Sequence, residues 1–249
     1  MKEEAQMGRN RTGIQMSPRD TKAMQSIPHK DGHPASGDEA AAAEMRAGYI
    51  AESDMVGSVP LPGTVKGALK TGASMLTGND TQLFMDKLGE RLAFERTGTR
   101  LYEALITKVE SLDDAGSITS ADLRHIRDEE HRHFMLVHKA IETLGGDPTS
   151  QTPCADVTGV ESMGLMQVVT DPRTTLAQSL HAILVAEMTD NNAWEMLIAM
   201  ASDQGHDDMA SDFTAALDSE RDHLQKVQQW FEEATLGHTQ RGGARQQLH

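Results

Sequence analysis

The sequence predicts an all-α protein with four long helices. Aromatic residues make up only 4% of the 249 residues and β-branched runs are few, whereas Ala, Leu, Met, Glu and Gln are frequent. These frequent residues favour helices over strands. Four long segments also carry apolar residues at helical spacing, and each is bounded by residues that begin or end helices. With 38% apolar residues, the chain can bury a sizeable core.

The first two predicted helices are separated by a short turn. The first begins at Asn79 or Asp80, either of which can cap it, and ends near Leu112. The second begins near Thr119 and ends at Gly145, a residue type that often closes helices. Because the connection is short, we expect these two helices to form an antiparallel hairpin.

The last two predicted helices form a second hairpin. The third begins after Asp171, which caps it and is followed by proline at the first helical position, and it ends near Gly205. The fourth runs from about Asp207 to Leu236, and Gly237 is its expected end.

A long connection joins the two hairpins at about residues 146–171. Pro148 and Pro153 favour an irregular linker, and residues 160–169 are apolar enough to pack part of it on the helices. A 30-residue helix is about 45 Å long, and an extended linker of about 25 residues spans that length. We therefore expect a crossover along the side of a four-helix bundle.

The two ends of the chain are predicted to lie outside this bundle. Residues 1–79 read as a mostly disordered extension, since the first 60 or so are rich in polar residues, Gly, Pro and Ala. Within it, Ala40 to Tyr49 favours a short helix. Gly63 to Leu76 favours either a floppy linker or a segment that docks on the bundle or a partner. Residues 237–249 read as a disordered tail.

Charge and cysteine content limit the partners and the location. A net charge of −15 argues against nucleic acid and anionic membranes, because both would repel the protein, and makes cations the natural ligands. The single Cys154 excludes an intramolecular disulfide, and the polar start of the chain contains no apolar signal. No apolar stretch approaches the roughly 20 residues of a membrane span. The sequence therefore predicts a cytoplasmic protein.

Metal-ligand residue types interrupt the apolar stripe of every predicted helix. The first and third helices each carry one glutamate there, and the second and fourth each carry a Glu-x-x-His pair. The six residues are Glu95, Glu130, His133, Glu187, Glu220 and His223. Four buried carboxylates would repel one another and oppose folding unless cations neutralised them. Two divalent ions would cancel the four charges, and each Glu-x-x-His pair lies on one helix face, within reach of one ion.

Within each hairpin, these residues are predicted to lie at the same level along the helix axes. In an antiparallel hairpin, residues equidistant from the turn face each other, so their midpoint falls in the turn. The midpoint between Glu95 and His133 is Asp114, and the midpoint between Glu187 and His223 is Gly205. The first glutamate precedes the Glu-x-x-His pair by 35 residues in one hairpin and by 33 in the other. We therefore expect a pseudo-twofold site with three ligands from each half.

This doubled pattern resembles the ferritin-like di-iron carboxylate superfamily, which includes bacterioferritin, rubrerythrin and the manganese catalases. The resemblance covers about residues 80–235. It implies a ferritin-like four-helix bundle with a long crossover between helices two and three, and two bound iron ions, with manganese as the alternative. It also implies that Glu95 and Glu187 are terminal ligands, that Glu130 and Glu220 bridge the ions, and that each histidine binds one ion.

Other polar or aromatic residues lie near the predicted site. Tyr102 follows Glu95 by seven residues, as Trp194 follows Glu187. Both are candidates for a redox role, similar to the tyrosine of the family, and otherwise are large core residues. Asp190 is either an extra ligand, resembling the additional carboxylate of rubrerythrins, or is not a ligand.

Some neighbouring residues are expected to play no part in the site. Glu129, His131 and His125 lie about 100° or more from the apolar stripe, so we expect them to be solvated. Cys154 has no partner motif and is expected to be inert.

The sequence therefore favours a di-iron oxidoreductase of the ferroxidase or peroxidase type. It would oxidise Fe(II), or reduce O2 or hydrogen peroxide, in iron homeostasis or oxidative-stress protection. One cysteine cannot build the Cys-x-x-Cys domain of rubrerythrins, so an external electron donor is expected. An iron-storage cage, a manganese catalase and a metal-free scaffold remain alternatives, and a homo-oligomer remains open.

Overall fold

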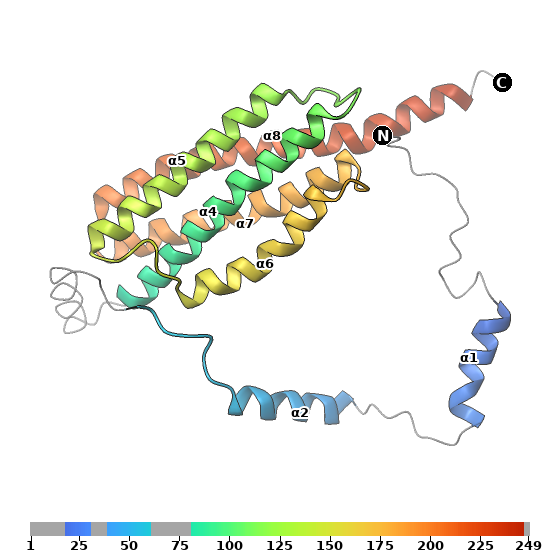
Figure 1. Cartoon of the computed structure of the whole chain (residues 1–249), viewed down its shortest axis with the longest axis horizontal. Coiled ribbons are helices and arrows are strands. Elements are labelled where there is room, and N and C mark those ends of the chain that lie inside the picture. Colours follow the sequence, from blue (N-terminus) through green and yellow to red (C-terminus); the bar gives the residue numbers. More distant parts are fainter. Residues whose placement is uncertain (1–17, 31–38, 61–80, 247–249) are drawn as a thin grey trace. The chain divides into compact units, whose positions relative to one another are not determined.

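The computed structural model describes residues 18–30, 39–60 and 81–246, and all regular elements in these ranges are α-helices (Figure 1). The chain divides into two units. The first holds α1 (Pro18–Lys30) and α2 (Glu39–Glu52). α2 confirms the predicted helix at Ala40 to Tyr49 and has no buried residue, whereas α1 was not predicted. The segment Gly63 to Leu76 lies outside the described residues.

The first predicted hairpin is present as α4 (Thr81–Glu110) and α5 (Ser120–Leu144), which pack against each other (Figure 1). The Thr119 hydroxyl accepts the backbone N–H of Asp122 and so caps α5. Gly145 ends it with a φ of 89°, a left-handed conformation that glycine adopts without strain. Both ends of α5 therefore lie where the sequence predicts them.

The connection between the hairpins is a helix, so the prediction of an irregular linker is wrong. α6 (Pro153–Thr170) is capped by Thr152, whose hydroxyl accepts the N–H of Ala155. Pro153 takes the first helical position, where proline is tolerated because its missing N–H has no helical partner. α6 packs against α4 and α7, and Gly89 of α4 leaves the space that the Thr152 side chain occupies.

The third predicted helix begins later than expected. α7 (Leu176–Asp203) is capped by Thr175, and the Gln178 side chain completes a capping box, so the predicted start at Asp171 is wrong. Asp171 instead ends α6. The buried Lys108 ammonium stabilises this turn, because it donates to the Asp171 carbonyl at 3.0 Å and to the Ser179 hydroxyl at 2.8 Å.

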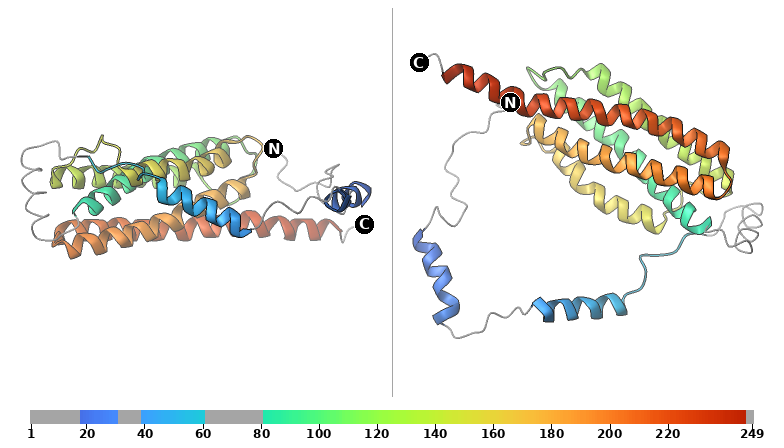
Figure 2. Two further views of the ribbon diagram at one scale, coloured as in Figure 1. Left: turned by 90° about the horizontal axis from the view of Figure 1, so that it is seen from below. Right: turned by 180° about the vertical axis from the view of Figure 1, so that it is seen from behind.

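The last helix, α8 (Asp207–Gln246), lies side by side with α7 (Figure 2). Gly205 makes the turn between them with a φ of 74°. The predicted helix end at Gly237 is wrong, because this glycine has no left-handed conformation and α8 continues past it. Among the described residues, no helix combines the length and the apolar character needed to cross a membrane.

Two apolar clusters fill the interior of this second unit, and a polar layer lies between them along the helices. One cluster includes Phe84, Leu88 and Phe213. The other includes Leu105 and Val227. Along α4, α5, α7 and α8, the predicted ligands lie between the residues of the two clusters.

Candidate metal centre

The structure buries all six predicted ligand residues. Their exposed fractions are 0% for Glu95, 1% for Glu130, 5% for His133, 2% for Glu187, 0% for Glu220 and 1% for His223. They come from four helices, α4, α5, α7 and α8. Glutamates are almost never fully buried unless they are paired or bind a cation. Four of them in one interior layer therefore indicate that something positive belongs there.

The ligand atoms of these residues gather in overlapping groups, each within 4.8 Å. The groups are Glu130, Glu187, Glu220 and His223; Glu95, His133 and Glu220; and Glu95, Glu130, Asp190 and Glu220. Each of the first two groups draws on both hairpins, since Glu130 lies with Glu187 and His223, and Glu220 lies with Glu95 and His133. Glu220 belongs to all three groups, and Glu95 and Glu130 belong to two each, so these carboxylates are placed to be shared between two ions.

Both histidines present Nδ1 to the carboxylates. His133 Nδ1 lies 2.5 Å from Glu220 Oε1 and 4.0 Å from Glu95 Oε2. His223 Nδ1 lies 3.1 Å from Glu220 Oε2 and 3.5 Å from Glu130 Oε1. Each imidazole can therefore share a cation with the glutamates through its Nδ1 atom.

Several of the buried ligand atoms have no hydrogen-bond partner. Three carboxylate oxygens have neither a hydrogen bond nor a close ion-pair partner, and these are Glu95 Oε2, Glu130 Oε2 and Glu187 Oε2. An unsatisfied buried polar atom costs about 1–3 kcal/mol, and more when it is charged. Acceptor atoms that converge without donors suit a metal ion rather than another hydrogen-bond network, so the residues present fit a bound cation.

The pKa directions show how strongly this interior disfavours negative charge. Burial raises the pKa of Glu95 and of Glu187 well above the usual value, and the neighbouring Asp190 and Glu130 carboxylates respectively raise it further. Burial also opposes ionisation of Glu220, but hydrogen bonds from His133 and His223 lower its pKa to about 2. The raised pKa values favour the neutral, protonated form of Glu95 and Glu187 unless a cation is bound beside them.

Arg91 is a component that sequence analysis missed. Its side chain is 2% exposed, and its Nε lies 3.1 Å from Glu95 Oε1. Its Nη1 forms an ion pair with Asp190, and its guanidinium stacks 4.3 Å over the Phe94 ring. The available signal was its position one helical turn before Glu95, on the same face.

The two aromatic candidates are buried beside the ligands. The Tyr102 hydroxyl donates a hydrogen bond to Glu187 Oε1. The Trp194 ring packs edge-on against His133, with ring centroids 5.8 Å apart. Burial and the Glu187 carboxylate raise the pKa of Tyr102 well above its usual value, so it remains a neutral hydrogen-bond donor.

Glu129 is not solvated, which corrects the expectation. Its side chain is only 18% exposed, and its Oε2 lies 2.9 Å from His223 Nε2. The expectation failed because α8 lies beside this flank of α5. His125 and His131 are exposed as predicted, although His125 Nε2 lies 3.2 Å from Glu129.

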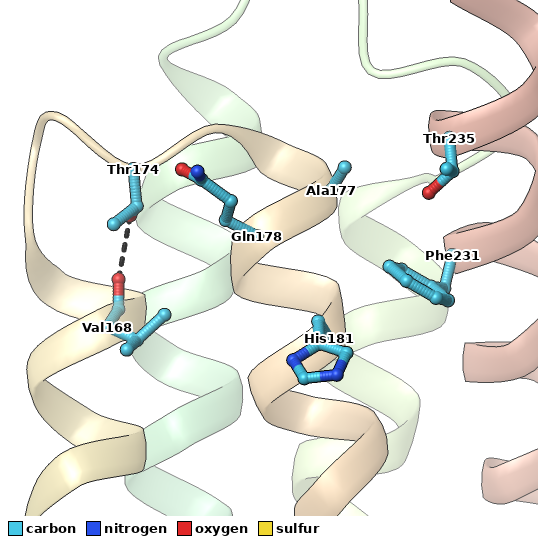
Figure 3. A pocket seen from close by; sticks show the side chains of 7 residues that line it. All are labelled: Val168, Thr174, Ala177, Gln178, His181, Phe231 and Thr235. Atoms are coloured by element: carbon cyan, nitrogen blue, oxygen red, sulfur yellow. Dashed lines mark hydrogen bonds between the residues drawn. The ribbon is translucent and has the colours of Figure 1, made fainter. Parts of the chain in front are cut away.

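A separate pocket lies among α6, α7 and α8 (Figure 3). It is lined by Val168, Thr174, Ala177, Gln178, His181, Phe231 and Thr235, none of which is a predicted ligand. Cys154 belongs to none of the candidate metal groups found among the described residues. Burial and a hydrogen bond with Asp86 raise its pKa to about 11, so it is mostly a thiol at neutral pH.

Comparisons with known proteins bring no further assignment. No family model, no curated protein and no solved structure matches this chain.

Proposed function

We propose that this chain is a ferritin-like di-iron oxidoreductase that oxidises Fe(II) and reduces O2 or hydrogen peroxide. In this proposal α4, α5, α7 and α8 form the four-helix bundle, and α6 is the crossover. The observation that carries it is the convergence of buried glutamate and histidine ligand atoms from four helices, with one donor-free oxygen each on Glu95, Glu130 and Glu187. Hydrogen-bonded polar cores leave few such atoms.

The charge of the site favours two divalent ions. Five carboxylates are buried there, those of the four predicted glutamates and Asp190, together with the Arg91 guanidinium. With neutral imidazoles, four negative charges remain, which two divalent ions neutralise. Carboxylate and imidazole ligands suit iron or manganese, whereas structural zinc sites favour cysteine and histidine.

The residues take distinct roles in this proposal. Glu187 belongs to one ligand group and Glu220 to all three, which supports a terminal role for Glu187 and a shared role for Glu220. By the resemblance to the ferritin-like family, Glu95 would be the second terminal ligand and Glu130 the second shared one. His133 and His223 would each bind one ion through Nδ1.

The protein would position the ions, exclude water from them and supply the negative charge that binds them. Two iron ions held side by side supply two electrons, which is the number needed to reduce O2 to hydrogen peroxide or peroxide to water. The apolar clusters on both sides exclude water from the carboxylates. An external donor would return the electrons.

The test is metal binding followed by turnover. Protein stripped of metal and titrated anaerobically with Fe(II) should bind two ions per chain, and exposure to O2 or peroxide should oxidise them. Glu130→Ala and Glu220→Ala should abolish two-metal binding. Asp128→Ala, which removes an exposed carboxylate from α5, is the matched control.

Other results would redirect the proposal. Release of O2 from peroxide by the manganese form would favour a manganese catalase. A mass of several hundred kilodaltons with mineral would favour a storage cage. Normal stoichiometry in both glutamate variants would contradict the ligand assignment.

A further inference from the structure

One oxygen of each proposed terminal carboxylate lies beside a donor group of the protein, in an ion pair at Glu95 and in a hydrogen bond at Glu187. Arg91 Nε lies 3.1 Å from Glu95 Oε1, and the Tyr102 hydroxyl donates to Glu187 Oε1. In both glutamates Oε2 has no hydrogen-bond partner. One oxygen of each carboxylate is therefore fixed by the protein, and the other is left for a ligand.

The two donors differ in charge. The guanidinium of Arg91 is permanently positive, whereas a phenol is neutral. Arg91 therefore offsets part of the negative charge of Glu95, while Tyr102 leaves the charge of Glu187 in place. Burial in the protein interior strengthens this difference, because little water screens it.

The number of candidate ligands does not separate the two halves. Glu187 belongs to one group of four residues, and Glu95 belongs to one group of three, with His133, and to one of four, with Asp190. The charge of Arg91 is therefore what favours a cation at the Glu187 half.

We propose that Arg91 is a positioning residue that makes the two metal positions unequal, so that the Glu187 half binds its ion first and more tightly. This inference rests on the proposed two-ion site. Arg91 lies beside Glu95 Oε1 and leaves Oε2 for the ion. The guanidinium also offsets the negative charge of Glu95 that would attract the second ion.

Asp190 limits this competition. Its carboxylate forms an ion pair with Arg91 across α4 and α7, and its exposed fraction is 2%. Part of the guanidinium charge is thereby directed away from Glu95. Removal of the Asp190 charge should therefore lower the affinity for the second ion, because the Arg91 charge is no longer offset. Removal of the Arg91 charge should raise that affinity, because Glu95 and Asp190 then both attract the ion.

Titration of the full-length, metal-free protein with Co(II), followed by calorimetry and by the visible absorption of bound Co(II), tests this inference. Wild-type protein should bind two ions in two separate steps. A neighbouring charge shifts the proton affinity of a carboxylate by about one to three powers of ten, and we expect a comparable effect on a cation. Arg91→Gln should therefore tighten the second step at least about tenfold and merge the two steps, while Asp190→Asn should weaken it. Arg96→Gln, which removes an exposed charge from the same helix, should leave both steps unchanged.

The outcomes separate this inference from the proposed function. A wild-type protein that takes up no Co(II) contradicts the two-ion site itself. Two ions bound with equal affinity contradict only the inequality. Arg91→Gln that weakens both steps shows that Arg91 serves the scaffold alone. If that variant does not fold, Asp190→Asn decides: a weaker second step supports the inference, and an unchanged or tighter one overturns it.

Discussion

His223 joins the candidate metal centre to Glu129 through its two ring nitrogens. Nδ1 faces Glu220 at 3.1 Å, and Nε2 lies 2.9 Å from Glu129 Oε2. Burial tends to raise the pKa of Glu129, but the hydrogen bond with His223 and the charges of His223, His125 and Arg132 together lower it, so Glu129 is a carboxylate that accepts. The Nε2 proton is thus held on the Glu129 side, so Nδ1 is the ring nitrogen that an ion would bind once it displaces the Nδ1 proton.

Glu129→Ala should weaken metal binding about 10–100-fold without abolishing it, because His223 loses the partner that fixes its tautomer and ring orientation. Fe(II) or Co(II) affinity, measured by titration, checks this. Asp128→Ala on the exposed side of α5 is the control. Equal affinity in both variants would show that Glu129 does not orient His223.

Gly98→Ala should disrupt metal binding while it leaves the helix intact. A Cβ at Gly98 would overlap Glu130 Oε2, so the carboxylate would have to leave its position. Alanine favours helix over glycine by about 1 kcal/mol, so α4 itself gains propensity. Gly159→Ala in α6, where a Cβ meets open space, is the control. We expect two ions per chain in the control and fewer in Gly98→Ala; two tightly bound ions in both would contradict the assigned position of Glu130.

Tyr102→Phe should lower the free energy of unfolding by about 1–3 kcal/mol, because a hydrogen bond to a buried carboxylate is lost. The stoichiometry of metal binding should not change, since Glu187 keeps both oxygens. Denaturant unfolding and metal titration measure these effects. If Fe(II) oxidation also slows while binding is normal, Tyr102 has a redox role in addition to its structural one.

The metal-free protein should lose stability as pH rises above about 4.5, the unfolded value of a glutamate. Burial raises the folded-state pKa of Glu95, Glu187 and Asp190 well above the unfolded values of 4.5 and 3.8. A carboxyl group of this kind contributes stability below its unfolded pKa, and the contribution is lost as pH rises through the folded pKa.

The histidine works in the same direction. Burial tends to lower the pKa of His223, but Glu130 and Glu220 raise it to about 12, so its contribution is lost between 6.5 and 12. Glu220, with a pKa of about 2, matters only below its unfolded value of 4.5. Bound metal displaces these protons, so the loaded protein should become more stable over the same range. Denaturant unfolding at several pH values checks both trends, and metal-free stability that rises with pH would contradict them.

The convergence of the six candidate ligands could be predicted because the helices are long and regular. Each glutamate interrupts an apolar stripe, and the turns at Asp114 and Gly205 fix the heights within each hairpin. The structure brings all six residues together, as their spacing in the sequence predicts. The spacing rule works because helix geometry converts sequence distance directly into position.

The residues that sequence analysis missed depend on contacts between helices. An arginine such as Arg91 on a helix stripe usually extends its charge to solvent, and its burial here depends on the opposing Asp190 of α7 together with Glu95. Glu129 lies off the stripe of α5, and its partner belongs to α8. Such pairs are not encoded in the periodicity of one helix.

The misplaced helix ends have a local cause. Two prolines suggested an irregular linker, but Pro153 directly follows the capping residue Thr152 and begins α6. Asp171 precedes a proline and resembles a cap, yet Thr175 and Gln178 form the complete capping box. Of the two candidate caps, Thr175 begins the helix because Gln178, three residues later, completes its capping box.

The polar layer that separates the two apolar clusters also divides the cooperativity of this helical unit. Apolar contacts join the helices at each end, whereas the middle holds buried carboxylates that repel one another and that the proposed ions would join. Amide hydrogen exchange should therefore report two regions that open independently in the metal-free protein and one that opens as a whole when ions cross-link the helices.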